Sequence, residues 1–251
     1  MAVIWRAERG GSSYEVRSAG ATRRLYTDGI FHSQFNPDSP LTGAVWDLLM
    51  LPAFLFPPQR IQRVLVLGVG GGAVIRQLET FLKPRHVTGI DIDPVHLDVA
   101  RQHFGVTGKN IRLLAADAIE WVHAAETGKY DLVIDDLFGR GPAGPLRAIK
   151  PTVEWCWQLA RVTSASGGVV MNCLAPRDLR HSGFMTDAGL RQRFASRMLL
   201  RSPVDENAVG AFLPFAVEAR ELRQNLKCVP GLNTAGARKA MRFSIQALAD
   251  A

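Results

Sequence analysis

After about residue 60, short apolar segments alternate with amphipathic ones along most of the chain. Residues 64–67 are a continuous apolar run, typical of a strand that is buried on both faces of a parallel sheet. Apolar residues at helical spacing follow over 74–82. Further strands are expected at 87–92, 111–115, 132–134 and 169–171, with helices at 94–105, 119–125 and 152–162. This alternation predicts a doubly wound, mostly parallel α/β sheet.

The two ends of the chain follow other patterns. In the first 36 residues, short β-branched and aromatic runs are separated by glycine turns, which predicts a small β-hairpin or sheet. A proline-containing loop and a helix at 41–51 come next. The last part of the chain predicts strands at 198–201 and 208–214, a helix at 218–227 and a β run at 241–245. We therefore expect an N-terminal β-strand region, residues 1–40, and a larger α/β domain, residues 41–251, with an antiparallel C-terminal strand.

Composition narrows the class of protein. Apolar residues make up 47% of the 251 residues and charged residues 21%, which is typical of a globular chain and excludes a disordered one. No apolar run approaches the ~20 residues that span a bilayer, and the N-terminus has no export-signal pattern. The three cysteines are odd in number and lack a C-x-x-C spacing. These features predict a cytoplasmic protein that does not contact a membrane.

The net charge of +7 comes mostly from the segment after residue 175, where arginines are frequent between 177 and 201. Such a run can bind nucleic acid, but here no aromatic ladder or known binding motif accompanies it. We interpret it as a solvated helix face and do not expect a nucleic-acid partner.

A glycine-rich turn, Gly-Val-Gly-Gly-Gly at 68–72, joins the first parallel strand to the following helix. Glycines there let the backbone turn sharply and approach a ligand closely, with helix N–H groups exposed. Gly68, Gly70 and Ala73 also satisfy the dinucleotide pattern G-x-G-x-x-G/A, so NAD is a candidate ligand.

Carboxylates follow the next two strands. Asp91 ends the second strand at a separation from Gly68 that suits hydrogen bonds from ribose hydroxyls, whereas Asp93 is better explained as a helix N-cap. Asp117 follows the third strand, where its side chain and the backbone of Ala118 can bind an adenine ring; the alternative is that Asp117 caps the next helix.

Two adjacent carboxylates, Asp135 and Asp136, end the fourth strand. Neighbouring strand residues point to opposite sides, so at most one of them faces the ligand crevice. A carboxylate there can orient or deprotonate a nucleophile. The alternative is a loop carboxylate paired with Arg140 or Arg147. Because ligands of open α/β sheets bind at the carboxyl ends of the strands, these residues predict one site.

Together the motifs resemble the spermidine synthase (polyamine aminopropyltransferase) family, which has a Rossmann-like, class I methyltransferase-like fold. The matching segments are LYTDGIFHSQ at 25–34, VLVLGVGGGAV at 64–74, GIDID at 89–93, AADAIEW at 115–121, YDLVIDDLFGRGPAG at 130–144 and NAVGAF at 207–212. The resemblance implies that Gly68, Gly70 and Gly72 hold a sulfonium nucleoside, Asp91 its ribose, and Asp117 with Ala118 its adenine. Asp136 matches the family's catalytic aspartate, and His32 or Gln34 its glutamine. It also implies a homodimer and no metal.

The chain departs from the family where the polyamine would bind. Gly71 stands where the family has an aspartate that faces the aminopropyl amine, and Gly139, or Phe138 with a shift of one residue, where it has a second aspartate. Val45-Trp46-Asp47 replaces a tyrosine–histidine–glutamate cluster. We expect a less acidic substrate pocket that includes His32, Trp46, Asp135 and Phe138.

Four functions remain open. The leading hypothesis is aminopropyl transfer from decarboxylated S-adenosylmethionine to a small-molecule amine, with Asp136 orienting or deprotonating the acceptor. The alternatives are an S-adenosylmethionine-dependent methyltransferase for a non-polyamine substrate and a nucleoside-binding protein without catalysis. An NAD-dependent oxidoreductase is the least favoured, because its fingerprint usually begins a chain or domain.

Overall fold

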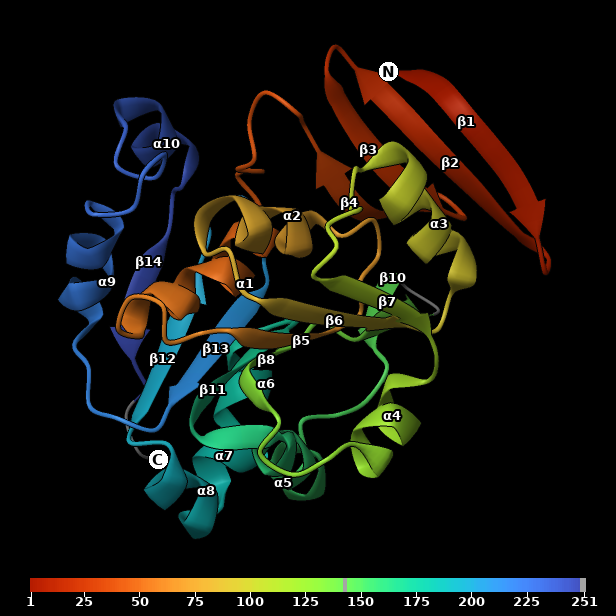
Figure 1. Cartoon of the computed structure of the whole chain (residues 1–251). Coiled ribbons are helices and arrows are strands. Elements are labelled where there is room, and N and C mark those ends of the chain that lie inside the picture. Colours follow the sequence, from red (N-terminus) through yellow and green to blue (C-terminus); the bar gives the residue numbers. More distant parts are fainter. Residues whose placement is uncertain (142–143, 249–251) are drawn as a thin grey trace.

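A computed structural model describes residues 1–141 and 144–248, and in these ranges the chain forms a small antiparallel sheet and a large mixed sheet (Figure 1). The small sheet is the predicted N-terminal β region. Its strands pair in sequence order: β1 (Ala2–Arg9), β2 (Ser12–Ala19), β3 (Thr22–Thr27) and β4 (Ile30–Phe35). Asp28 and Gly29 turn the chain between β3 and β4, both with positive φ.

The large sheet has the strand order β14-β12-β13-β11-β8-β5-β6-β7 over the described residues. Its strands are β5 (Arg63–Leu67), β6 (His86–Asp91), β7 (Ile111–Ala115), β8 (Tyr130–Asp135), β11 (Thr163–Cys173), β12 (Ser196–Arg201), β13 (Ala208–Leu213) and β14 (Ser244–Ala247). Strands β11, β8, β5, β6 and β7 are parallel. Strand β13 runs antiparallel to β11 and β12, and β14 antiparallel to β12. The predicted doubly wound sheet with an antiparallel C-terminal strand is confirmed.

Alternate side chains of the central strands pack into two separate hydrophobic cores, one on each face of the large sheet. Val64 and Val66 belong to one core and Leu65 and Leu67 to the other, because successive strand side chains point to opposite faces. One face packs against α1 (Val45–Met50), η1 (Leu51–Leu55), α2 (Ala73–Phe81), α3 (Pro94–His103), α9 (Ala219–Leu226) and α10 (Ala235–Ala240). The other packs against α4 (Ala118–Ala124), α5 (Val153–Val162), α6 (Pro176–Arg180), α7 (Gly183–Thr186) and α8 (Ala188–Arg193).

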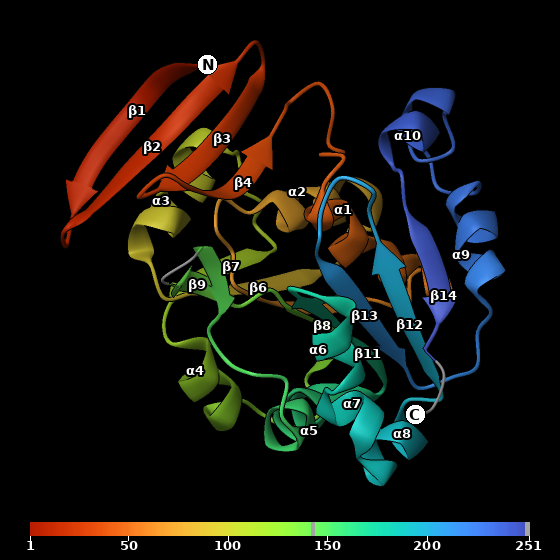
Figure 2. The ribbon, with the colours of Figure 1, turned by 180° about the vertical axis from the view of Figure 1, so that it is seen from behind.

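The N-terminal sheet lies beside α3, on the opposite side of the molecule from α9 and α10 (Figures 1 and 2). Val16 and Leu25 of this sheet join the same core as α2 and α3. The sheet ends at Phe35 and α1 begins at Val45, so the connection contains the proposed boundary at residue 40, which stays a prediction.

Several elements differ from the sequence expectations, among them the short helices α6, α7 and α8, for which no separate helices were expected. A hairpin of β9 (Phe138–Gly141) and β10 (Gly144–Arg147) follows β8, where Gly and Pro residues hide any strand pattern. Helix α10 was not predicted, because it has six residues and buries only Ala237, so it shows no apolar pattern at helical spacing. Strand β14 begins three residues later than the predicted β run. Within the described residues, no helix is both long and apolar enough to cross a membrane.

Candidate active site

A cavity of about 570 Å³ opens where the carboxyl ends of the parallel strands meet the N-terminal sheet. Its walls come from the strand ends, from β2, from the β3–β4 turn, from the β9–β10 hairpin and from the loop between β12 and β13. Of the residues expected from the sequence, the following line it: Gly68, Gly70, Asp91, Asp117, Ala118, Asp136, His32, Trp46 and Phe138. The tertiary structure thus brings together residues that are up to about a hundred positions apart in the chain.

The glycine turn contributes three residues to the cavity: Gly68, Val69 and Gly70. Gly68 and Gly70 have φ values of 84° and 52°, which glycine adopts without strain. A side chain at Gly68 would overlap the backbone carbonyl of Asp136, so glycine is required there. Gly72, also left-handed, precedes α2, and a Cβ on it would lie 2.7 Å from Val106. Gly72 therefore allows α2 to pack closely against Val106, and it is not among the described residues that line the cavity. Its contact with a ligand stays a prediction.

Asp91 holds the glycine turn in place. Its Oδ2 accepts hydrogen bonds from the N–H groups of Val69 (2.9 Å) and Gly70 (2.8 Å), and its Oδ1 accepts one from Asp93 (2.9 Å). Burial by itself would raise the pKa of Asp91, but His96 and these N–H donors outweigh it, so the pKa is lowered. Asp91 is a buried carboxylate at the cavity wall, and contact with a ribose remains a prediction.

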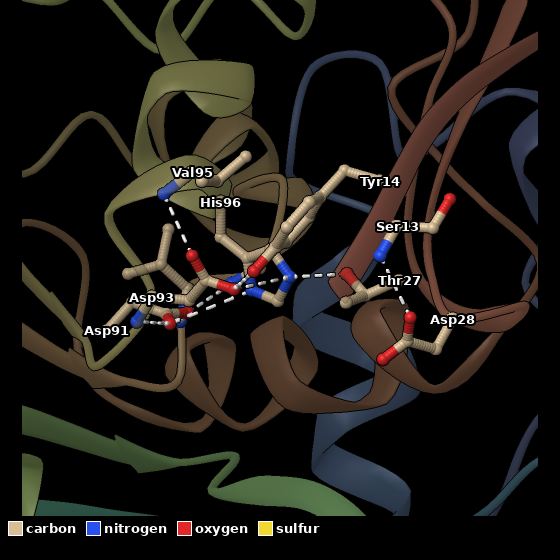
Figure 3. A network of polar contacts seen from close by, with 10 residues as sticks. Ser13, Tyr14, Thr27, Asp28, Asp91, Asp93, Val95 and His96 are labelled. Carbon is tan, nitrogen blue, oxygen red and sulfur yellow. Dashed lines mark hydrogen bonds and ion pairs between the residues drawn. The ribbon is translucent and has the colours of Figure 1, made fainter. Parts of the chain in front are cut away.

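A polar network connects Asp91 to the N-terminal sheet (Figure 3). His96 Nδ1 lies 3.7 Å from Asp91 Oδ1, and His96 Nε2 lies 2.8 Å from the Thr27 hydroxyl. The Tyr14 hydroxyl donates to Asp93 Oδ2 (2.7 Å), and Asp93 also caps α3, as predicted. Burial would lower the pKa of His96, but the two carboxylates outweigh it and raise the pKa. The network joins the N-terminal sheet to the glycine turn through one imidazole.

The ring of His32 lies beside that of His96, with centroids 4.8 Å apart and the planes tilted by 49°. Burial, and then the neighbouring imidazole of His96, lower the pKa of His32 to about 4. His32 is therefore a neutral side chain of the cavity wall at neutral pH.

Asp117 caps α4 and lines the cavity at the same time. Its Oδ1 accepts hydrogen bonds from the N–H groups of Ile119 (2.7 Å) and Glu120 (3.2 Å). Asp117 therefore caps the helix. Asp117 and Ala118 both line the cavity, and their contact with an adenine ring stays a prediction.

Asp136 faces the cavity from the end of β8. The Asn172 amide donates to its Oδ1 (2.7 Å), and Asn207 donates to the Asn172 carbonyl oxygen (3.0 Å). Desolvation, with a smaller contribution from the charge of Asp135, raises the pKa of Asp136 to about 7. A carboxyl group with this pKa can take up and release a proton near neutral pH.

Asp135 points to the other side of the strand. It is fully buried, and its Oδ2 accepts from the Arg147 guanidinium (2.7 Å) and the Trp155 indole (2.9 Å). Its assignment to the substrate pocket stays a prediction, and Asp135 is outside the set of described residues that line the cavity. The alternation of side chains along β8 is the reason, and a buried carboxylate then needs the Arg147 counter-charge.

Gln34 is also directed away from the described cavity wall. Its side chain accepts from Arg24 Nε (2.9 Å) and donates to the Thr42 carbonyl (3.3 Å), so it connects β4 to the next loop. The register between β3 and β4 shifts at His32, because Leu25 pairs with Ser33 and Tyr26 with Phe31. Of His32 and Gln34, which regular alternation would place on one face, only His32 lines the cavity. Asp47 likewise serves the loop before α1, where it accepts the N–H groups of Thr42 (2.9 Å) and Gly43 (2.8 Å).

Several cavity residues were missed by the sequence analysis: Tyr14, Asp28, His96, Asn172, Asp205 and Asn207. Asn172 could have been found, because it is a polar residue at the carboxyl end of the fifth parallel strand. Asp28 accepts the Ser13 N–H (2.9 Å) and pairs with Arg140 of β9 (3.1 Å). The other residues carry no local signal. Within residues 1–141 and 144–248, no group of His, Cys, Asp and Glu side chains is arranged to hold a metal ion.

The chain is similar in sequence to known methyltransferase domains and polyamine-forming transferases. A methyltransferase-domain family matches residues 64–142. A polyamine aminopropyltransferase of Vibrio vulnificus is 29% identical over 134 residues, 52% of this chain and 44% of that protein. A spermine synthase of Arabidopsis thaliana is 32% identical over 118 residues, 44% of this chain and 31% of the relative. The chain is similar to spermidine synthases. The match covers less than half the length of these relatives.

Solved structures agree on the fold. A probable spermidine synthase from Corynebacterium glutamicum superposes with a TM-score of 0.70 at 17% identity, over 90% of this chain and 88% of that one. A spermidine synthase in complex with the transition-state analogue AdoDATO gives 0.66 at 15% identity, over 88% and 76%. Human methyltransferase-like protein 13 in complex with SAH gives 0.59 at 18% identity, over 72% and 87%. The fold is class I methyltransferase-like; the homodimer and the cytoplasmic location stay predictions.

Proposed function

We propose that this protein is a spermidine synthase-like transferase that moves an aminopropyl group from decarboxylated S-adenosylmethionine to an amine. The observation that carries the proposal is Asp136: a carboxyl group with a pKa of about 7, held by Asn172 at the wall of a cavity next to the glycine turn. The similarity to named aminopropyltransferases supports the same reaction class.

In this proposal the nucleoside lies at the strand ends. Gly68 and Gly70 allow its close approach, and their turn is held by Asp91 before any ligand arrives. The ribose would lie at Asp91 and the adenine at Asp117 and Ala118, all of which line the same cavity. A preformed turn of this kind costs little conformational entropy on binding.

The transfer is an in-line displacement at carbon. The acceptor enters as an ammonium ion and gives one proton to the Asp136 carboxylate. The freed lone pair on nitrogen forms a bond to the aminopropyl carbon next to sulfur, while the carbon–sulfur bond breaks and its electron pair stays on sulfur. The products are methylthioadenosine and a secondary ammonium ion, and Asp136 then releases its proton to water. Alignment of nitrogen, carbon and sulfur supplies most of the acceleration.

Methyl transfer from intact S-adenosylmethionine is the second candidate, and Gly71 favours it. A Cβ at Gly71 would lie 2.8 Å from both Phe104 and Ser33, so this position has no room for a carboxylate. The donor's own carboxylate would therefore meet no negative charge from residue 71. Asp136 would orient the nucleophile in this reaction too.

Product analysis with both donors tests the proposal. The protein is incubated with a panel of mono- and diamines and either decarboxylated or intact S-adenosylmethionine, and the nucleoside products are separated by mass spectrometry. Methylthioadenosine together with an aminopropylated amine supports the proposal, and S-adenosylhomocysteine with a methylated acceptor supports the second candidate. Calorimetry with the two donors, methylthioadenosine and NAD is the control. Binding without product indicates a nucleoside-binding protein, and binding of NAD alone contradicts every sulfur-nucleoside function.

A further inference from the structure

The order of the strands divides the cavity into two halves. Asp91 and Asp117 follow β6 and β7, on one side of β5. Asp136 follows β8 and Asn172 lies in β11, on the other side of β5. In the proposed function the first half holds the nucleoside, so the acceptor lies in the second half, beside Asp136.

Apolar side chains follow both polar residues of the acceptor half. Phe138 lines the cavity two residues after Asp136, and Leu174 lines it two residues after Asn172. Both side chains are partly exposed. The strand ends that carry the proposed base therefore also present hydrocarbon surface to the cavity.

An aromatic pair extends this apolar wall. Phe31 of β4 and Trp46 of α1 line the cavity and lie edge-on to each other, with centroids 5.2 Å apart and planes at 85°. The start of α1 is next to the β12–β13 loop, because the N–H of Val45 is close enough to lower the pKa of Asp205. The same loop carries the asparagine that donates to the Asn172 side chain. The aromatic pair therefore belongs to the acceptor half.

Phe31 stays 40% exposed although its neighbours hold the ring in place. Its centroid lies 5.5 Å from that of Tyr26, and the Arg24 guanidinium lies over the ring at 5.5 Å. Apolar surface that stays in contact with water is unfavourable, and an apolar ligand that covers it gains free energy. The ring is therefore suited to contact the hydrocarbon part of a ligand.

Little negative charge is left free along this wall. Asp28 pairs with Arg140 (3.1 Å). The Oδ2 of Asp205 is screened from solvent, so a ligand in the cavity does not reach it. Gly139 stands where the family resemblance implies an acid. Among the residues that the structure describes, Asp136 is the carboxylate of this half that is left to meet an ammonium group.

We propose that the acceptor half takes an amine with one ammonium group and an apolar body, and selects against a diamine of the same length. The inference rests on the proposed function, because it needs an amine nucleophile at Asp136. The ammonium group meets Asp136, and the hydrocarbon chain lies against the aromatic side chains. A second ammonium group at that wall loses water without gaining a counter-charge, which is costly.

Calorimetry with two amines of equal length tests the inference without relying on turnover. The full chain is saturated with methylthioadenosine and titrated with pentylamine or with butane-1,4-diamine, which has an ammonium group in place of the terminal methyl group. We expect pentylamine to bind at least about tenfold more tightly. Phe31→Ala should weaken pentylamine binding at least about fivefold and change diamine binding less. Ile4→Ala is the control, because Ile4 is an exposed apolar residue of the same sheet and is not among the described residues that line the cavity.

A second variant adds the missing charge. A side chain at Gly139 meets no atom within 4 Å, so Gly139→Asp fits without displacing its neighbours. It should shift the preference toward butane-1,4-diamine at least about tenfold, as expected for one charge-assisted hydrogen bond. Gly139→Asn, which has the same shape and no charge, should keep the wild-type preference. This pair also tests the inference if Phe31→Ala does not fold.

The outcomes separate the inference from the function. A wild type that binds the diamine as tightly as pentylamine, or that binds neither amine, overturns the inference even if aminopropyl transfer occurs. An unchanged preference in both Phe31→Ala and Gly139→Asp overturns it as well. Absence of product from any amine and donor, in the assay described above, overturns the proposed function instead, whatever preference calorimetry measures.

Discussion

The two halves of the cavity use carboxylates in opposite ways. At the proposed nucleoside half, Asp91 and Asp117 accept hydrogen bonds from backbone N–H groups of their own chain. At the acceptor half, Asp136 accepts one side-chain hydrogen bond, from Asn172, and Asp205 keeps an oxygen without a donor. The first pair of carboxylates fixes backbone segments at the cavity wall, whereas Asp136 depends on one side-chain donor.

The carboxylates of the two halves therefore differ in their ability to exchange a proton. At Asp91, His96 and then the backbone N–H donors stabilise the ionised form, outweigh burial and lower the pKa, so this carboxylate is a poor base. A carboxylate withdrawn from water with few donors has a raised pKa, as at Asp136, and can exchange a proton at neutral pH. The same residue type therefore serves structure in one half and chemistry in the other.

The largest expected effect is on turnover. Asp136→Asn should lower kcat by about 10²–10⁴-fold, the usual contribution of a general base, while the affinity for methylthioadenosine stays within about twofold of the wild type. Steady-state kinetics and calorimetry on the same preparation measure the two quantities, and Glu206→Gln controls for loss of a negative charge. A variant that turns over normally would assign the base to another residue.

The neighbouring carboxylates should respond in opposite directions to loss of charge. Asp135→Asn leaves Arg147 buried without its partner and should lower the free energy of unfolding by about 3–5 kcal/mol. Asp136 has a folded-state pKa of about 7 against an ordinary value of 3.8, so its ionisation costs stability as the pH rises from about 4 to 7. Asp136→Asn should therefore be more stable than the wild type at pH 8.

Urea unfolding of both variants at pH 5 and pH 8 measures this contrast. Two variants that are destabilised alike would mean that Asp136 is a structural carboxylate, and the difference between the two halves of the cavity would disappear.

A smaller effect is expected at Asp91. Asp91→Asn replaces one acceptor oxygen with an NH₂ group that faces backbone donors, so it should cost about 1–3 kcal/mol of stability. The affinity for methylthioadenosine should fall at least about tenfold, because the glycine turn is no longer held. Calorimetry and urea unfolding measure both quantities. If Asp91→Asn binds methylthioadenosine as tightly as the wild type, Asp91 takes no part in nucleoside binding.

The smallest effect concerns the link to the N-terminal sheet. Because the pKa of His96 is raised in the folded protein, its charge stabilises the fold below pH 6.5, and this contribution is lost as the pH rises through the raised value. His96→Gln should remove about 0.5–1.5 kcal/mol at pH 6 and much less at pH 9. The exposed His86 provides the control variant His86→Gln. A pH-independent loss would show that only the hydrogen bond to Thr27 matters.

Local pattern was sufficient for most of the fold. The apolar run at 64–67, the glycine turn and the acids at 91, 117 and 136 repeat at regular spacing, and the strand ends of a parallel sheet meet at one edge. Their arrival at one cavity could therefore be predicted from the chain alone. So could the alternation that turns one of Asp135 and Asp136 inward, and the family resemblance favoured Asp136 for the catalytic role.

Only the tertiary structure decided which donors each carboxylate meets. The sequence left Arg140 and Arg147 open as partners of the carboxylates at 135 and 136, and the structure pairs Arg147 with Asp135. Thr27 lies 69 positions from His96, so that contact has no local signal. The same holds for Asp205, which is brought to the cavity by a loop joining two antiparallel strands. The sequence pattern determines on which strand end a carboxylate lies. Its pKa and the hydrogen bonds that it can still accept depend on neighbours that only the folded chain brings near.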